Sequence, residues 1–395
     1  MSDRHRRRWV AAIAAAAAVV LAVVLPIALS GGGASRHLPE VTTSATAPAP
    51  GPAPPPSGQQ LGASVNRLFN AQTYTPAQID GQLAALAATG ATIGRSDALW
   101  EAAEPAAPTG ASHHYDWSFA DRIAGSLAAR GLRWLPIIDY SAPWAQSVAG
   151  QDHSPPSDPA AYAAYAAAFA ARYGPSGSFW TAHPELRAEP VEDYEIWNEP
   201  DNPVFWFPAP DAAAYARLYT EARVAIRAVQ PEAQVLVGGL THPRTFMRGM
   251  LAADPSLRGA IDGVAIHPYG RTPALVLHNV RGARLALDSL GLASVPLWVT
   301  ELGWTTSPPG ALDYLPERLR PTYIERTVAT LGHVECGIAG TILYTWLTPE
   351  RDPADPQDWF GINPPTGGSS PDVAAFAAAI RAARVAAPAV PLCGR

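Results

Sequence analysis

Two glutamates, each at the end of a short apolar segment, are the residues of this sequence best suited to chemistry. Glu199 follows an alternating apolar segment that begins at Tyr194, and Pro200 ends this segment because proline cannot continue a sheet ladder. Glu301 follows the apolar segment 296–300 in the same way. In a parallel sheet or barrel, active sites assemble at the carboxyl ends of the strands. Two glutamates at two such ends are the side chains needed to break a glycosidic bond.

The spacing of the two glutamates fits a barrel built from repeated strand–helix units. Positions 199 and 301 are 102 residues apart. An eight-unit barrel of about 250 residues uses roughly 31 residues per unit, so this separation corresponds to about three units. The spacing therefore predicts that Glu199 follows the fourth strand and Glu301 the seventh.

Apolar segments of strand length alternate with segments of helical periodicity along most of the chain. The expected strands are residues 61–69, 91–97, 133–138, the segment ending at Glu199, 234–240, 261–266, the segment ending at Glu301, and 338–344. This rhythm predicts an α/β fold, a single (β/α)8 TIM barrel. An open doubly wound sheet is the alternative, but no glycine-rich phosphate turn follows the first strand.

The two glutamate motifs resemble those of a known clan of enzymes. Trp197-Asn198-Glu199-Pro200 resembles the acid/base motif of the clan A retaining glycoside hydrolases, and residues 298–304 resemble the nucleophile motif of that clan. Family 39 and the cellulase-like exopolysaccharide hydrolases are the most similar groups. The resemblance spans most of residues 61–382, but only the two motifs are specific. It implies that Glu199 is the acid/base and Glu301 the nucleophile, with no metal or organic cofactor.

The resemblance also implies roles for polar residues at other strand ends. Asn198 is placed to bind the 2-hydroxyl of the sugar. Arg95, at the end of the second strand, resembles the arginine that supports the nucleophile, although an ion pair with Asp97 is the alternative. His267 and Tyr269, after the sixth strand, resemble the histidine and tyrosine near the nucleophile, although a lone histidine is more often structural.

Three tryptophans are candidates for stacking on sugar rings. Trp346, after the eighth strand, resembles the clan's platform beneath the sugar at the cleavage point. Trp144 lies on the loop after the third strand, where it could instead cap the upper core. Trp206 lies in the aromatic loop 205–207, which we expect to form a subsite wall, with core packing as the alternative.

The charge composition of the chain limits the kinds of molecule that it is expected to bind. The chain has 395 residues, of which 16% are charged, and a formal net charge of −6. Its arginines beyond the N-terminus are scattered, which argues against nucleic-acid binding. We expect a monomer that acts on an oligo- or polysaccharide.

The N-terminal 60 residues have the composition of an export segment and a spacer. Residues 1–30 combine a basic head with the apolar run 9–29, which is typical of a signal peptide or a membrane anchor. Residues 31–60 are rich in Pro, Ala, Ser and Thr and predict a linker. The catalytic barrel is then expected over residues 61–395, at the cell surface or outside the cell.

The only two cysteines are Cys336, before the last strand, and Cys393, after the last helix. An exported protein favours a disulfide between them, at the amino-terminal face of the barrel; two unpaired thiols are the alternative. Neither has metal-ligand spacing to a second cysteine.

The expected reaction is double displacement with retention, for which the carboxyl groups lie about 5–5.5 Å apart. A non-catalytic carbohydrate-binding protein of the cell envelope and a transglycosidase are the alternatives. The sequence leaves the sugar open among β-xylosides, β-glucan or mannan chains, and exopolysaccharide or cell-wall glycans, and it leaves endo or exo action open.

Overall fold

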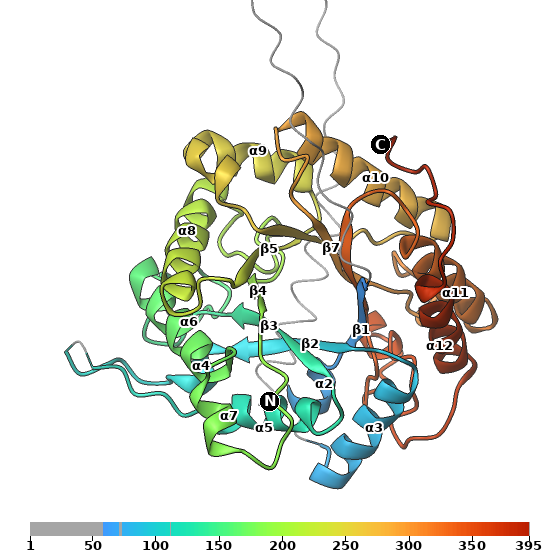
Figure 1. Cartoon of the computed structure of the whole chain (residues 1–395), viewed down its shortest axis with the longest axis horizontal. Coiled ribbons are helices and arrows are strands. Elements are labelled where there is room, and N and C mark those ends of the chain that lie inside the picture. Colours follow the sequence, from blue (N-terminus) through green and yellow to red (C-terminus); the bar gives the residue numbers. More distant parts are fainter. Residues whose placement is uncertain (1–57, 71–72, 111, 395) are drawn as a thin grey trace, which may run out of the picture. The chain divides into compact units, whose positions relative to one another are not determined.

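The protein forms a closed barrel of parallel strands surrounded by helices. The computed structural model describes residues 58–70, 73–110 and 112–394. The strands pair in chain order, and the first pairs with the eighth to close the barrel. Figure 1 shows the helices arranged around the strands. The predicted (β/α)8 TIM barrel is therefore confirmed, while the predicted leader and nearly all of the predicted linker, residues 1–57, lie outside the described residues.

The barrel strands are short, and their side chains alternate between the barrel interior and the helix layer. In chain order they are β1 Gln60–Ser64, β2 Ile93–Leu99, β3 Arg133–Asp139, β4 Asp193–Ile196, β5 Gln234–Leu240, β6 Gly263–Ile266, β7 Leu297–Leu302 and β8 Ile338–Leu343.

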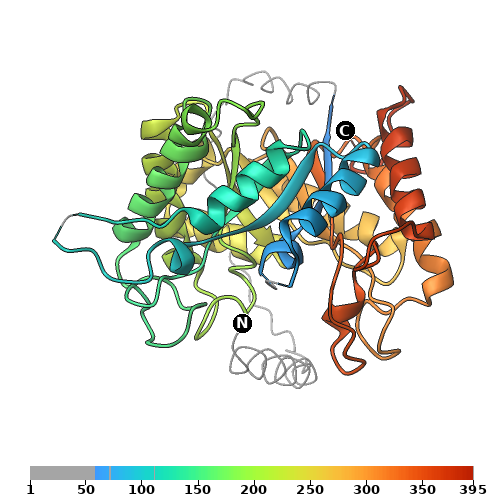
Figure 2. The same ribbon diagram turned by 90° about the horizontal axis from the view of Figure 1, so that it is seen from below.

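One long helix follows each strand and covers the outside of the barrel. These helices are α3 Pro76–Ala88, α5 Ser118–Ala128, α6 Pro159–Tyr173, α8 Ala212–Val229, α9 Pro243–Ala253, α10 Pro273–Ser289, α11 Arg320–Leu331 and α12 Pro371–Arg384. Shorter helices lie in the connections: α2 Asn66–Asn70, α4 Trp100–Ala103, α7 Ser178–Ala182, η1 Pro255–Gly259, η2 Glu317–Leu319 and η3 Pro356–Trp359. Figure 2, turned by 90°, shows the loop after α4 extending away from the barrel.

Local sequence signals explain where the long helices begin. Thr75 caps α3 through a reciprocal capping box with Gln78, and Pro76 occupies the first helical position. Asp158 and Asp211 cap α6 and α8 by accepting backbone N–H groups of the first turn. Each of these caps immediately precedes the first residue of its helix.

The barrel interior is filled by a small apolar cluster that is separate from the larger core under the helices. Trp298 of β7 reaches across it, and a Cβ atom on Gly340 of β8 would lie 2.3 Å from the Trp298 ring. Glycine is therefore needed at 340 to admit the indole. The other cluster members are Ile93, Leu135, Leu236, Ala265 and Ile342.

Several expected elements differ from the observed ones. The first strand ends at Ser64, not residue 69, because Asn66 and Asn70 lie one helical turn apart and both donate hydrogen bonds to Asp97. The helix after β5, for which the sequence analysis gives no range, is α9; it begins at Pro243 and buries Phe246, Met247, Met250 and Leu251.

The disulfide between Cys336 and Cys393 is present, with the two Cα atoms 5.3 Å apart. Cys336 precedes β8, so the bond lies at the amino-terminal end of the barrel, as predicted. Among the described residues, no helix has the length and apolar character needed to cross a membrane.

Candidate active site

Glu199 and Glu301 meet at the carboxyl end of the barrel. Glu199 lies in the turn after β4, and Glu301 is the penultimate residue of β7. One carboxylate oxygen of each and one ring nitrogen of His267 all lie within 4.8 Å of one another. Two acids that are remote in sequence therefore face a common space.

The turn that carries Glu199 has an unusual backbone. Trp197 and Glu199 adopt positive φ values of 64° and 46°, a region that costs most residues about 1–2 kcal/mol. The surrounding contacts hold them there: the Trp197 indole donates to the carbonyl of Phe205 (2.6 Å) and its backbone N–H to the carbonyl of Ile138 (3.1 Å). Such backbone strain is typical of residues whose position is set by function.

The Glu199 carboxyl has a different partner on each oxygen. Oε2 accepts a hydrogen bond from the Asn202 side chain at 2.6 Å. Oε1 lies 2.7 Å from Nδ1 of His267. Because a neutral imidazole nitrogen can accept a proton as well as donate one, this second contact suits a glutamate that gives and takes a proton.

The Glu301 carboxyl is surrounded by donors. Arg95 donates from Nη1 to Oε1 at 2.7 Å, and the Tyr269 hydroxyl donates to Oε2 at 2.8 Å. Burial by itself would raise the pKa of Glu301, but the charges of His267 and Arg95 and the hydrogen bonds from Tyr269 and Arg95 lower it below its ordinary value. Glu301 is thus held as a carboxylate, the form that a nucleophile needs.

Arg95 is fully buried and its guanidinium joins Glu195 to Glu301. Its guanidinium binds both oxygens of Glu195, at 2.7 and 3.0 Å, in addition to Glu301. Burial would lower the pKa of Arg95, but the charges of Glu195 and Glu301 raise it above its ordinary value. The alternative ion pair with Asp97 is not formed, since Asp97 accepts its hydrogen bonds from the two asparagines of α2.

Asn198 is oriented by the same arginine. Its side-chain oxygen accepts from Nη2 of Arg95 at 3.0 Å. The NH2 group of Asn198 has no hydrogen-bond partner among the described residues. The side chain therefore presents a free donor beside the two glutamates.

His267 is buried behind the glutamates and touches both. Its Nδ1 lies 2.7 Å from Glu199 and 3.7 Å from Glu301, and its Nε2 lies 3.2 Å from the hydroxyl of Thr300. Burial would lower the pKa of His267, but the charge of Glu301 and the hydrogen bond and charge of Glu199 outweigh it, so the pKa is raised. A Cβ atom on Gly239 would lie 2.0 Å from Nε2, so glycine at 239 makes room for the ring.

Of the three tryptophans expected to stack on sugars, only Trp144 keeps an accessible surface. Its indole N–H donates to the carbonyl of Glu104 at 3.0 Å, and its ring packs edge-on against Trp100. Its predicted role as a sugar platform stays a prediction.

Trp206 and Trp346 are buried, which corrects the expectation that their rings face a ligand. Trp206 is 1% exposed and packs between Trp197 and Tyr215, with ring centroids 5.2 and 5.7 Å away. Trp346 has no exposed surface, and its indole N–H donates to Gln82 at 2.9 Å. For Trp206, the alternative of core packing is therefore the one that the structure supports. After β8, the aromatic ring that keeps an exposed surface is that of Tyr344, and not that of Trp346.

Three contributors were missed by the sequence analysis. Glu195 and Thr300 point into the barrel on β4 and β7, and Asn202 follows Glu199 in the turn. Strand alternation could have revealed Glu195, because the flanking Tyr194 and Ile196 pack into the outer core.

Asp139, at the end of β3, is a further buried acid near the site. It has no exposed surface, and neither carboxyl oxygen has a hydrogen-bond partner among the described residues. Burial, and then the nearby charge of Asp97, raise the pKa of Asp139 well above its ordinary value.

Glu199, His267 and Glu301 are also close enough for their ligand atoms to meet at a metal ion. Nδ1 of His267 and Oε1 of Glu199 are 2.7 Å apart, the distance of a hydrogen bond. A tetrahedral zinc site, with bonds of about 2.0–2.2 Å, would hold two such atoms about 3.4 Å apart. The present geometry therefore suits a shared proton better than a zinc ion.

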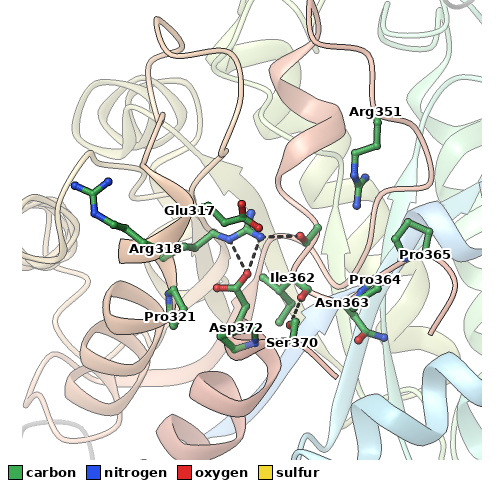
Figure 3. Close-up of a pocket in the computed structure, with 13 residues that line it drawn as sticks. Glu317, Arg318, Pro321, Arg351, Ile362, Asn363, Pro364, Pro365, Ser370 and Asp372 are labelled. Carbon is green, nitrogen blue, oxygen red and sulfur yellow. Dashed lines mark hydrogen bonds and ion pairs between the residues drawn. The ribbon is translucent and has the colours of Figure 1, made fainter. Parts of the chain in front are cut away.

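A separate pocket of about 520 Å³ lies between the start of α11 and the start of α12 (Figure 3), and neither Glu199 nor Glu301 lines it. Its central cation, Arg320, is already satisfied by Asp372 and by the carbonyl groups of Trp359 and Gly361. These contacts fix the loops to α12, which is a structural role.

Comparison with family models gives no match, and neither does comparison with curated proteins. Solved structures of similar fold do exist. A family 39 β-xylosidase from Caulobacter crescentus is 21% identical, with a TM-score of 0.61 over 82% of this chain and 72% of its own. A family 39 enzyme from Xanthomonas axonopodis pv. citri is 19% identical, with a TM-score of 0.62 over 82% and 67%.

A family 5 variant from Bifidobacterium longum, solved with Manβ1-4GlcNAc, is 14% identical, with a TM-score of 0.59 over 85% of this chain and 80% of its own. At such low identity the likeness concerns the fold. The chain therefore has the barrel fold seen in family 39 and family 5 glycoside hydrolases, in agreement with the clan resemblance of its two glutamate motifs.

Proposed function

We propose that the protein is a retaining glycoside hydrolase that cleaves O-glycosidic bonds of an oligo- or polysaccharide. The observation that carries this proposal is the pairing of two unlike glutamates within 4.8 Å. Glu301 is surrounded by donors that keep it ionised, whereas Glu199 faces an imidazole nitrogen with which it can exchange a proton. One catalytic step needs a nucleophile and an acid at the same time, and these environments supply both.

In the first half-reaction, a Glu301 oxygen forms a bond to the anomeric carbon while the bond from that carbon to the leaving oxygen breaks. Glu199 gives its proton to the leaving oxygen. The free NH2 group of Asn198 donates to a sugar hydroxyl and strengthens this contact as positive charge develops on the sugar.

In the second half-reaction, Glu199 takes a proton from water as the water oxygen bonds to the anomeric carbon and the Glu301 ester bond breaks. Two inversions give net retention. The short separation of the glutamate oxygens supports this course, since retaining sites hold their carboxyl groups about 5–5.5 Å apart and inverting sites about 6.5–9.5 Å.

The substrate class is proposed from the clan resemblance and from the proteins of similar fold. A β-xyloside is one candidate, because one of these proteins is named a β-xylosidase, and a β-mannoside is another, because the family 5 structure holds Manβ1-4GlcNAc. β-Glucans and exopolysaccharide or cell-wall glycans complete the set.

The working location is proposed to be the cell surface or the outside of the cell. The basic head and the apolar run 9–29 support export or tethering, and the Cys336–Cys393 disulfide supports an oxidising compartment. A monomer is proposed.

The test is a screen of the purified full chain against aryl glycosides and polysaccharides, with ¹H NMR of the first product. We expect the retained anomer. Glu301→Ala should abolish turnover. Glu199→Ala should spare the first half-reaction for aryl groups that leave without a proton, and should abolish it for poor leaving groups. Glu185→Ala, at an exposed glutamate that pairs with His183, is the matched control.

The outcomes separate the alternatives. Binding of a glycan without turnover would identify a carbohydrate-binding protein, and transfer of the sugar to an added acceptor in preference to water would identify a transglycosidase. Wild-type activity in both glutamate variants would exclude the assigned roles.

A further inference from the structure

Glu195 is the buried centre of two chains of hydrogen bonds, one to each catalytic glutamate. Through Arg95 it reaches Glu301. Through the Thr300 hydroxyl, 3.2 Å from its Oε1, it reaches Nε2 of His267, and Nδ1 of the same ring contacts Glu199. The backbone N–H of Gly239 also donates to Oε1, at 2.9 Å. A single carboxylate thus supports both catalytic side chains.

The chemistry of these groups fixes the direction of the second chain. A carboxylate only accepts hydrogen bonds, and Glu195 already accepts from the Arg95 fork. Thr300 therefore gives its only hydroxyl proton to Glu195. Its oxygen can then bond to His267 only as an acceptor, which requires a proton on Nε2.

With Nε2 protonated, the contact between Nδ1 and Glu199 contains a single proton. When His267 is neutral, this proton is bound to Glu199, which is the form that a catalytic acid needs. When His267 is an imidazolium, the proton is bound to Nδ1 and Glu199 is a carboxylate. We propose that Thr300, held by Glu195, is a positioning residue that keeps Nε2 of His267 protonated and so reserves one proton for the pair formed by Nδ1 and Glu199. This inference rests on the proposed function for its catalytic meaning.

The residues around His267 leave little space for its ring to move or rotate. Gly239 backs Nε2 so closely that a Cβ atom would lie 2.0 Å from it. The charged groups that face the ring are Glu199, Glu301 and Arg95. The titratable Tyr269 ring lies edge-on, 6.3 Å away.

Removal of the Thr300 hydroxyl tests the proposal. In Thr300→Val, Nε2 would face an apolar side chain, so neutral His267 is expected to move its proton to Nδ1 and donate it to ionised Glu199. This hydrogen bond would stabilise the ionised carboxylate relative to the protonated acid. The alkaline limb of the kcat/KM–pH profile should move down by about one pH unit, and Thr300→Ser should restore it.

A second readout does not depend on activity. In protein labelled with ¹⁵N-histidine, the His267 signals, assigned by their loss in His267→Gln, should show a protonated Nε2 in the wild type and in Thr300→Ser. A protonated Nδ1 should replace it in Thr300→Val. Thr327→Val is the matched control, because the Thr327 hydroxyl of α11 is equally buried and has no partner among the described residues.

An unprotonated Nε2 in the wild type, or a Thr300→Val variant with unchanged ¹⁵N signals and an unchanged alkaline limb, would overturn the inference. A wild type with protonated Nε2 that cleaves no glycoside would instead overturn the proposed function. Thermal unfolding of each variant shows whether it is folded, and so distinguishes unfolding from a change in the position of the proton on His267.

Discussion

The guanidinium of Arg95 lies 2.7 Å from Oε1 of Glu301, on a side chain that is itself fully closed to solvent. A cation in this position cannot be screened by water, so it stabilises the carboxylate strongly. The Tyr269 hydroxyl adds a second donor on the other oxygen.

The first prediction concerns the acid limb of the pH profile. Burial raises the pKa of Glu301, but the charges of His267 and Arg95 outweigh burial and lower it. The acid limb of kcat/KM should therefore lie below the ordinary glutamate value of about 4.3. Tyr269→Phe removes one donor and should raise that limb by about one pH unit. Equal acid limbs in the two proteins would contradict the assignment of Glu301.

Gly239→Ala should displace His267, because the new Cβ would overlap Nε2 of the ring. A shift of about 1 Å in a catalytic group can cost roughly 100-fold in rate, so we expect kcat/KM to fall by about that factor. Gly282→Ala in α10, where a Cβ meets nothing within 4 Å, is the control and should keep full activity. Equal kcat/KM in the two variants would argue against a fixed ring.

Asp139→Asn should change how stability depends on pH. The pKa of Asp139 in the folded state is raised, so the folded protein binds more protons than the unfolded chain above the unfolded pKa of about 3.9. Its contribution to stability is therefore lost as pH rises, at up to about 1.4 kcal/mol per pH unit until the folded pKa is passed.

Urea unfolding of both proteins at pH 4, 5.5 and 7 checks this expectation. Relative to the wild type, Asp139→Asn should gain stability as pH rises. Asp80→Asn, at an exposed ion pair with Arg130, is the control. Parallel curves for Asp139→Asn and the wild type would show that Asp139 titrates normally.

Removal of the disulfide should cost stability without cost to catalysis. The two cysteines are 57 residues apart in sequence, and closing such a loop typically stabilises by about 2–4 kcal/mol. The Cys336→Ser/Cys393→Ser double variant should unfold at lower urea concentration and keep its kcat/KM at 25 °C, because the bond lies at the end of the barrel remote from Glu199. A reductant should lower the urea concentration of unfolding of the wild type and leave that of the double variant unchanged. A loss of activity in the double variant would show that the two ends of the barrel are coupled.

Patterns local to one element were predictable from the sequence. Strand ends placed Glu199 and Glu301 correctly in the fold, whereas Arg95 is the third residue of the seven in β2 and does not lie at its end. The barrel followed from the alternation of these elements, since few topologies satisfy that order.

Burial of loop side chains was not predictable in the same way. Trp206 is covered because its loop folds back onto Tyr215 of α8, and Trp346 because Gln82 of α3 takes its indole N–H. Gln82 is remote in sequence from Trp346, and Tyr215 meets Trp206 only once the loop between them has folded back, so no periodic pattern contains either contact. For Glu195, strand alternation predicts that the side chain points into the barrel, but its partners Arg95, Gly239 and Thr300 come from three other strands and are not predictable locally.

The start of β1 has a consequence for access by large molecules. Gln60 lies at the end of the barrel opposite to Glu199 and Glu301. A support attached at Gln60 itself would thus contact the barrel at its amino-terminal end and leave the opening beside Glu199 and Glu301 unobstructed for a long polymer.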